Sequence, residues 1–298
     1  MSGNTYQVIC FGEILWNVLP QRAVPCGAPM NVAYHLNKLG KSPALITRVG
    51  FDDKGKELIN LLSGCGISTD FFQVDYHTQT GVVHTRIKKD DEMVYDIVKP
   101  AAWDYIQWED DFESLLQNAS YFVFGSLVAR NAQSKNILFQ CMEIAKIKVF
   151  DINIRSPFFH QQLIEELLGK TDVLKMNIAE LHLVSGWYND YKNDLERVKS
   201  LRERFNIKSI IVTKGNDGAL FNLDETFYSH PGYTVKVAGT SGSGDAFLAA
   251  IISKLIDRAP PVEALDFASR LGAYVASRKE ACPDYTLSVL DRIHILQN

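Results

Sequence analysis

The sequence lacks a long hydrophobic run, a basic block and paired cysteines. None of its apolar stretches approaches the roughly 20 residues that a membrane-spanning helix needs. Its 31 Lys and Arg residues face 35 Asp and Glu residues, for a formal net charge of −4, which argues against nucleic acid as the main partner. We therefore expect neither a nucleic acid nor a membrane as a partner.

The five cysteines are scattered along the chain, and none lies in a Cys-x-x-Cys pair. This pattern is typical of reduced thiols in a cytosolic protein. The seven histidines show no metal-ligand spacing, so no histidine or cysteine metal site is expected. The first residues also lack the basic region of a signal peptide, and we expect a cytoplasmic protein.

The composition, with 46% hydrophobic and 22% charged residues, is ordinary for a globular protein, and we expect residues 1–298 to form a single α/β domain. Short apolar segments alternate with helical ones, and strands are predicted at 121–124, 148–151, 173–175 and 210–213. This rhythm indicates a doubly wound, mostly parallel sheet. Ligands of such sheets bind beyond the carboxyl ends of the strands.

Residues 82–87 and 93–98 depart from this rhythm because each alternates apolar and polar residues around a charged turn. They predict a hairpin, which we interpret as part of a lid over the sheet edge, with lid strands from about residues 13–30 and 80–100. An open lid exposes hydrogen-bonding edges and apolar side chains such as Val83 and Met93. We therefore expect a homodimer formed through the lid.

The turn Gly242-Ser-Gly-Asp245 is the most informative stretch of the chain. The alternating residues 233–237 before it predict a strand, and the apolar residues after it predict a buried helix. A helix N-terminus offers unpaired N–H groups, and glycine lets an anion approach them. The turn therefore predicts a phosphate cradle beside the Asp245 carboxylate, although a Gly-rich turn capped by Asp or Ser fits the same residues.

Together with motifs elsewhere, this turn resembles those of the ribokinase-like (PfkB) carbohydrate kinases, most of all the bacterial fructokinases. The motifs occur in the family's order at residues 12–16, 27–33, 48–55, 151–155, 177–180, 213–215 and 242–245. The resemblance implies a ribokinase-like three-layer α/β/α sandwich with a mostly parallel central sheet and a small β-strand lid. It also implies an ATP- and Mg²⁺-dependent kinase that phosphorylates a primary hydroxyl of a small carbohydrate, with fructose as the first expectation.

The resemblance implies roles for the residues around the turn. Asp245 would be the general base that accepts the proton of the sugar hydroxyl. The backbone N–H groups of Gly242, Ser243, Gly244 and Asp245 would form an anion hole for the transferred phosphoryl group. The Arg155 guanidinium, a planar cation with several N–H donors, would bind the same phosphoryl group, although a surface ion pair is the alternative for this residue.

The resemblance also implies binding residues. Thr213 and Gly215 would line the nucleotide. Asn177 and Glu180 would hold magnesium near the triphosphate, with Glu180 as the metal residue acting through water, although a Glu in a first helical turn is often a capping residue. The adenine pocket is expected in the helical region 262–277. Sugar contacts are expected from Asn17, Gly27, Asn31, Arg86, Tyr95 and Asn153, and a plain surface charge is the alternative for Arg86.

The chain departs from the family's pattern at four positions. Asn17 replaces an Asp, and Cys26 replaces the first glycine of a Gly-Gly pair, which affects the sugar site. Gly239 replaces an Asp that helps to hold a monovalent cation, and Glu280 stands near a position that is usually glycine beside the same loop. Because a hard cation needs oxygen ligands, we expect potassium activation to be weak or absent.

Two alternatives remain open at this point. The acceptor could be another small molecule, such as ribose, a keto-deoxy sugar acid or a nucleoside. The four departures also motivate a non-catalytic sugar- or nucleotide-binding relative. The presence of Asp245, Arg155, Asn177 and Glu180 argues against the second alternative.

Overall fold

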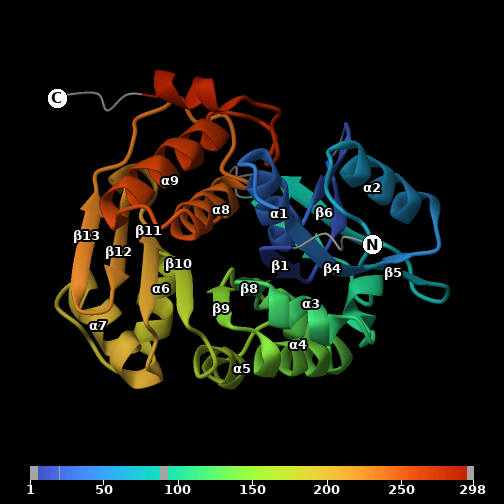
Figure 1. Ribbon diagram of the computed structural model, residues 1–298, viewed down its shortest axis with the longest axis horizontal. Helices are drawn as coiled ribbons and strands as arrows, with labels where there is room; N and C mark the ends of the chain where they lie inside the picture. The colour runs from blue at the N-terminus through green and yellow to red at the C-terminus, as the bar shows by residue number, and fades with distance from the viewer. Residues whose placement is uncertain (1–5, 20, 88–92, 294–298) are drawn as a thin grey trace.

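A nine-stranded sheet forms the centre of the molecule, which is represented by a computed structural model that describes residues 6–19, 21–87 and 93–293 (Figure 1). Its strand order is β13-β12-β11-β10-β9-β8-β1-β4-β5. The seven strands from β11 to β5 pair in parallel. The two remaining pairs, β11 with β12 and β12 with β13, are antiparallel. The bounds are β1 (Val8–Phe11), β4 (Pro43–Gly50), β5 (Phe72–Asp75), β8 (Tyr121–Gly125), β9 (Ile147–Asp151), β10 (Val173–Asn177), β11 (Ser209–Thr213), β12 (Ala219–Leu223) and β13 (Thr226–His230).

Helices cover both faces of this sheet (Figure 1). One face carries α1 (Ala28–Lys38), α2 (Asp53–Gly64), α8 (Ser243–Ile256) and α9 (Pro261–Ala276). The other carries α3 (Phe112–Asn118), α4 (Ala132–Ile144), α5 (Gln161–Leu168), α6 (Ile178–Gly186) and α7 (Asp194–Phe205). Because both faces are covered, the strands are apolar on both sides, as Val149 and Phe150 of β9 show by packing into opposite cores. The predicted three-layer α/β/α sandwich is confirmed.

Four further strands form a smaller sheet, hereafter the small sheet, in the order β3-β2-β6-β7. They are β2 (Leu15–Val18), β3 (Ala23–Cys26), β6 (Gly81–Ile87) and β7 (Met93–Ile97). The predicted hairpin is present, because β6 and β7 pair antiparallel, while its turn at 88–92 lies outside the described residues. β2 joins β6 in parallel, so the two segments predicted for the lid form one sheet. Short 3₁₀ helices lie at Ala102–Tyr105, Leu127–Arg130, Gly215–Asp217 and Leu287–Arg292.

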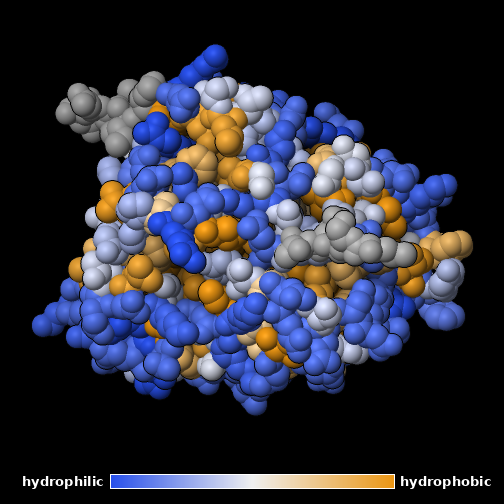
Figure 2. All heavy atoms as spheres, in the orientation of Figure 1, coloured by the Kyte–Doolittle hydropathy of each residue, from blue (hydrophilic) through white to orange (hydrophobic). Residues whose placement is uncertain are grey.

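Hydrophobic residues lie mainly inside the molecule. On the face shown in Figure 2, hydrophilic residues predominate and hydrophobic ones form small, separate groups. Among the helices of the described chain, none combines the length and the apolarity that a bilayer crossing requires.

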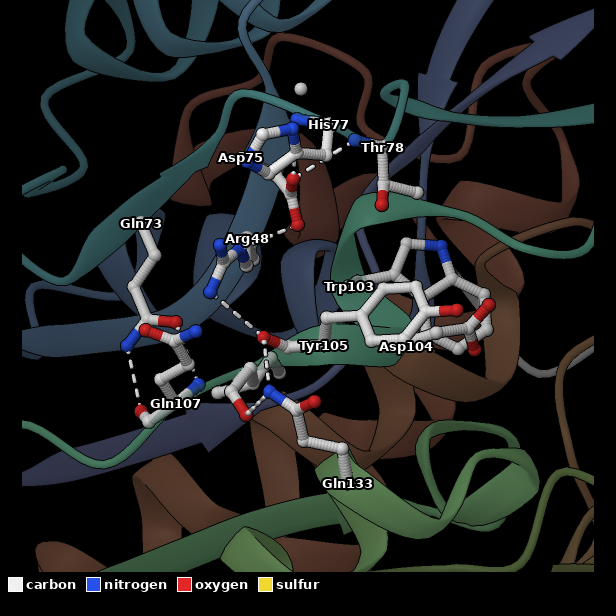
Figure 3. A network of polar contacts seen from close by, with 12 residues as sticks. Arg48, Gln73, Asp75, His77, Thr78, Trp103, Asp104, Tyr105, Gln107 and Gln133 are labelled. Carbon is white, nitrogen blue, oxygen red and sulfur yellow. Dashed lines mark hydrogen bonds and ion pairs between the residues drawn. The ribbon is translucent and has the colours of Figure 1, made fainter.

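A network of polar contacts fixes the end of β5 from which the chain continues into the small sheet (Figure 3). The Asp75 carboxylate lies 3.0 Å from Arg48 Nε and accepts hydrogen bonds from the backbone N–H groups of His77 and Thr78. Arg48 also donates to the Tyr105 carbonyl at 2.9 Å. These contacts join β4, β5 and the segment after β7, so the small sheet is anchored to the large one at its base.

The prediction of a strand at 233–237 is wrong. This segment is extended and alternates in burial, with Tyr233 buried and Val237 48% exposed, but its residues pair with no strand. Alternation in the sequence therefore reports an extended chain that packs one side against the protein, not a ladder of hydrogen bonds. The strands next to it in the sequence are β12 and β13, which were not predicted.

Candidate active site

A cleft of about 800 Å³ opens at the carboxyl ends of the parallel strands, between the large sheet, the small sheet and the N-terminus of α8. It contains every residue that the sequence nominated except Arg86, whose side chain lies outside the described part of the structure. The nominated residues that line it are Asn17, Gly27, Asn31, Tyr95, Asn153, Arg155, Asn177, Glu180, Thr213, Gly215, Gly242, Ser243, Gly244 and Asp245. Residues up to 228 positions apart in the chain are thus gathered at one site.

The N-terminus of α8 presents unpaired backbone donors to the cleft. The N-cap, Gly242, has a φ of 78°, and a Cβ there would lie 2.5 Å from the Cβ of Ala281, so only glycine fits without strain. No protein acceptor among the described residues bonds the N–H groups of Ser243, Gly244 or Asp245. These groups, at the positive end of the helix dipole, are suited to bind an anion.

Asp245 lies in the first turn of α8 and is held by α1. Its Oδ2 accepts a hydrogen bond of 2.7 Å from Asn31 Nδ2, and the Cys282 thiol donates to Asn31 Oδ1 at 3.3 Å. Burial raises the pKa of Asp245 to about 6, and the Asp151 carboxylate adds to the rise, while Lys175 and the Asn31 bond oppose it. A carboxylate with this pKa is ionised at neutral pH yet close to the range in which a general base is most effective.

Arg155 and Asn153 follow β9 on the other side of the cleft. The Arg155 guanidinium carbon lies 5.8 Å from the centre of the Tyr95 ring, which the small sheet supplies. Among the described residues Arg155 forms no ion pair, so its charge is available to a ligand. Asn153 has a φ of 39°, a conformation that Asn tolerates better than most residues and that lets the chain turn at the strand end.

The end of the cleft beneath the small sheet combines polar and apolar side chains. Asn17 accepts a hydrogen bond of 2.7 Å from Thr85, so part of its amide is already engaged. Gly27 has a φ of 142°, and a Cβ there would lie 2.3 Å from the Glu13 carbonyl oxygen. The apolar residues at this end are Leu15, Val83, Ile97 and Leu127.

Glu13 was not nominated as a site residue, although it lines the cleft directly after β1. Its Oε1 accepts from the Ala28 N–H at 3.3 Å, and its Oε2 is buried with no hydrogen-bond partner in the part of the chain that the structure describes. Burial raises the pKa of Glu13 to about 7. The signal that could have identified it is its place at the carboxyl end of a central parallel strand.

Asn177 and Glu180 form a capping box at the start of α6. Asn177 Oδ1 accepts from the Glu180 N–H at 2.9 Å, and Glu180 Oε2 accepts from the Asn177 N–H at 2.8 Å. Glu180 Oε1 also accepts from the Ile154 N–H at 2.9 Å. The described residues contain no cluster of three or more His, Cys, Asp or Glu side chains that could hold a bare metal ion. The oxygens present fit a hydrated Mg²⁺, which keeps several waters and binds mainly to phosphates.

A smaller pocket of about 170 Å³ adjoins the cleft beyond Gly244. It is lined on one side by the extended segment with Tyr233 and Val235, and on the other by α9. The α9 residues are Ser269, Gly272, Ala273 and Ala276, whose spacing places small side chains on one helix face. This largely apolar space lies in the region that the sequence nominated for adenine.

The fold is the ribokinase-like α/β fold, and its cleft contains a helix N-terminus that is suited to bind an anion. The family model for "pfkB family carbohydrate kinase" matches residues 3–286, and the chain belongs to this family of carbohydrate kinases. A curated relative, probable fructokinase-7 of Arabidopsis thaliana, is 26% identical over 93% of this chain and 88% of its own length.

Two solved structures extend the comparison. A fructokinase from Vibrio cholerae in its fructose-, ADP- and calcium-bound form has a TM-score of 0.82 and 22% identity, covering 97% of this chain and 99% of its own. An aminoimidazole riboside kinase from Salmonella enterica, complexed with aminoimidazole riboside and an ATP analogue, has a TM-score of 0.80 and 24% identity, covering 96% and 98%. These similarities establish the fold, and they do not determine which molecule accepts the phosphoryl group.

Proposed function

We propose that the protein transfers the γ-phosphoryl group of ATP to a primary hydroxyl of a small sugar, with fructose the first candidate. The Asp245 carboxylate accepts the hydroxyl proton as the sugar oxygen forms its bond to the γ-phosphorus. The bond between that phosphorus and the bridging oxygen breaks, and ADP leaves with the negative charge. The N–H groups of Ser243, Gly244 and Asp245 and the Arg155 guanidinium stabilise the charge on the transferred oxygens.

The observation that carries this proposal is the position of one carboxylate among unpaired donors. Asp245 has a pKa of about 6, is oriented by Asn31, and lies in the same helical turn as N–H groups without a protein acceptor. A capping Asp would use its oxygens on those N–H groups, and Asp245 does not do so. A base and an anion hole so close together are what phosphoryl transfer to an alcohol requires.

The nucleotide and the metal are proposed to bind along the same wall of the cleft. Thr213 and Gly215 are shared by the cleft and the smaller pocket, so a nucleotide could place its base against α9 and its phosphates at α8. Magnesium bound through water near Asn177 and Glu180 would neutralise phosphate charge. Glu180 would then accept from metal-bound water with lone pairs that its backbone contacts leave free.

The test is an assay of ADP release with ATP and magnesium across sugars. Turnover on fructose that exceeds turnover on ribose, a keto-deoxy sugar acid and adenosine would support the proposal in full. Turnover on another acceptor would support the kinase activity and would replace fructose as the proposed acceptor. ATP binding without turnover on any acceptor would contradict the proposal and favour a non-catalytic relative.

One feature of the cleft favours a nucleoside as the second candidate acceptor. Leu15, Val83 and Ile97 of the small sheet line the sugar end of the cleft and make this part of its wall apolar. An acceptor with a flat, partly apolar substituent would cover these side chains, whereas free fructose would leave them against hydroxyls. Adenosine and a smaller riboside in the same panel separate the two candidates.

Turnover should depend little on potassium. Glu280, beside the loop of Gly239, pairs with Arg22 of the β2–β3 turn at 3.2 Å instead of facing an open site. Gly239 itself offers no carboxylate. We expect rates in potassium and in tetramethylammonium to agree within about twofold, because a site short of oxygen ligands binds a hard cation weakly. A strong potassium requirement in the same assay would overturn this expectation.

The protein is proposed to be a cytoplasmic homodimer. All five cysteines are free, which supports a reducing compartment. Val83 faces the cleft and is not available to a partner, while the side chain of Met93 lies outside the described residues. The proposal therefore rests on the outer edges of β3 and β7, which no described strand covers. Light scattering at micromolar concentration should give twice the mass of the chain, and a monomer would contradict the proposal.

A further inference from the structure

Two charged side chains lie buried beneath the N-terminus of α8. Asp151 of β9 and Lys175 of β10 are register partners in the parallel ladder. Val149 and Val173, two residues earlier, pack into the core that contains α8, so both charged side chains project toward the same helix. Lys175 Nζ lies 3.0 Å from each carboxylate oxygen of Asp151, and the two side chains are 8% and 3% exposed.

The Lys175 ammonium fills the space directly below Gly244. A Cβ at position 244 would lie 2.8 Å from Nζ, closer than real Cβ contacts allow. The positive end of a helix dipole disfavours a cation at this place. A buried ion pair also gives little net stability, because desolvation offsets the attraction. Neither the helix nor the core therefore accounts for a lysine here, whereas an anion bound at the helix N-terminus does.

We propose that Lys175, held by Asp151, is a positioning residue for phosphoryl transfer, whose fixed positive charge lies behind the anion hole and keeps Asp245 ionised. The inference rests on the proposed function, in which Asp245 is the base and the first turn of α8 receives the phosphoryl group. Like Arg155, Lys175 lines the cleft, and it balances part of the charge on that group from its place beneath Gly244.

The charges around Asp245 explain why the lysine matters. The groups that face it are Asp151 on β9, Lys175 on β10, Arg155 after β9, Glu13 after β1, Cys26 on β3, Asn31 on α1 and Cys282 near the C-terminus. Burial and the Asp151 carboxylate raise the pKa of Asp245, and Lys175 lowers it. Burial alone would lower the pKa of Lys175, but Asp151, Asp245 and Glu180 outweigh it, so the lysine stays charged. Without Lys175, Asp151 acts uncompensated and more of the base is protonated at neutral pH.

The test compares the pH dependence of kcat in wild type, Lys175→Met and the double variant Lys175→Met/Asp151→Asn. In the single variant the acidic limb of the kcat–pH profile should shift to higher pH by about one unit or more. The double variant removes both opposing charges, so the limb should return close to its wild-type position while the plateau rate stays about tenfold or more lower. An acidic limb unchanged in Lys175→Met would overturn the proposal. If that variant fails to fold around the unpaired Asp151, a wild-type plateau in the double variant would overturn it.

Lys148→Met is the matched control. Lys148 Nζ of β9 lies 2.9 Å from Oδ2 of Asp172, the residue before β10, so this ion pair links the starts of the same two strands, at the end remote from the cleft. Its loss should leave both the plateau and the acidic limb unchanged. A similar loss of rate in this variant would mean that any ion pair between these strands sustains activity through the fold, and would overturn the specific role of Lys175.

A second measurement separates this inference from the proposed function. The carboxyl carbon of Asp245 can be titrated by NMR without substrate, with Asp245→Asn to identify its signal. A higher pKa in Lys175→Met than in wild type supports the role of the lysine, and an equal pKa overturns it. A wild-type protein that turns over no sugar would contradict the proposed function, and this titration would still decide whether Lys175 keeps Asp245 ionised.

Discussion

Replacing Asp245 by Asn is expected to lower kcat by about 10²–10⁴-fold, the usual contribution of a positioned general base, with ATP binding retained. Asn has nearly the same size, and its amide oxygen can still accept the bond that Asn31 donates to Oδ2. What is lost is the group that takes the hydroxyl proton. Because this group acts in the transition state, kcat and kcat/KM should fall together.

The pH profile gives a second readout for the same variant. The pKa of Asp245 is raised to about 6, so the base is protonated below and ionised above that value. The wild-type rate should therefore rise with pH through about pH 6, and the limb should disappear in the variant. Asp257→Asn, at the other end of α8, makes the same chemical change far from the cleft and should leave the rate unchanged. A kcat for Asp245→Asn close to that of wild type would contradict the assignment of the base.

Replacing Gly242 by Ala should lower kcat by about 10²–10³-fold, comparable with the loss of an anion-hole donor. Gly242 has a φ of 78°, which L-residues adopt at a cost. The new methyl group would lie 2.5 Å from the Cβ of Ala281 and 2.8 Å from its carbonyl oxygen. The first turn of α8 must shift to relieve this contact, and the N–H groups of Ser243 and Gly244 then no longer converge on one point.

Gly186→Ala provides the control for this change. Gly186 ends α6, and a Cβ there would meet nothing within 4 Å. Steady-state kinetics and thermal unfolding of both variants should show a large loss of kcat only for Gly242→Ala. Wild-type turnover in Gly242→Ala, with the variant folded, would contradict an anion hole at this turn.

The sequence predicted the central strands well because their apolar runs are buried on both faces by helices. β8, β9, β10 and β11 all follow from that signal. It fails at the edge of the sheet: the turn between β12 and β13 contains Asp224 with a φ of 50°, and neither a glycine nor a proline marks it. The extended segment at 233–237 shows the converse, since its alternation arises from packing without pairing.

Many of the candidate residues that sequence analysis nominated lie near the ends of strands of the large sheet or at the start of α8. Those it missed depend on partners across the sheet. Lys175 looks like an interruption of an apolar strand until the register places it beside Asp151. Glu13 lies two residues after β1, and only the folded chain shows that its Oε2 has no hydrogen-bond partner among the described residues. Sequence motifs thus locate the cleft. The charges beneath α8 become apparent only when the register of β9 and β10 places Lys175 beside Asp151.

The free cysteines also determine how the protein should respond to electrophiles and oxidants. Cys26 lines the cleft and Cys282 contacts Asn31, yet burial raises the pKa of both thiols, so they remain protonated. The thiolate is the reactive form, and Cys65 at the end of α2 is the exposed cysteine of the described chain. A maleimide dye should therefore attach at Cys65 first. Mild oxidation should likewise modify Cys65 at the surface before it reaches Cys26 and Cys282 at the cleft.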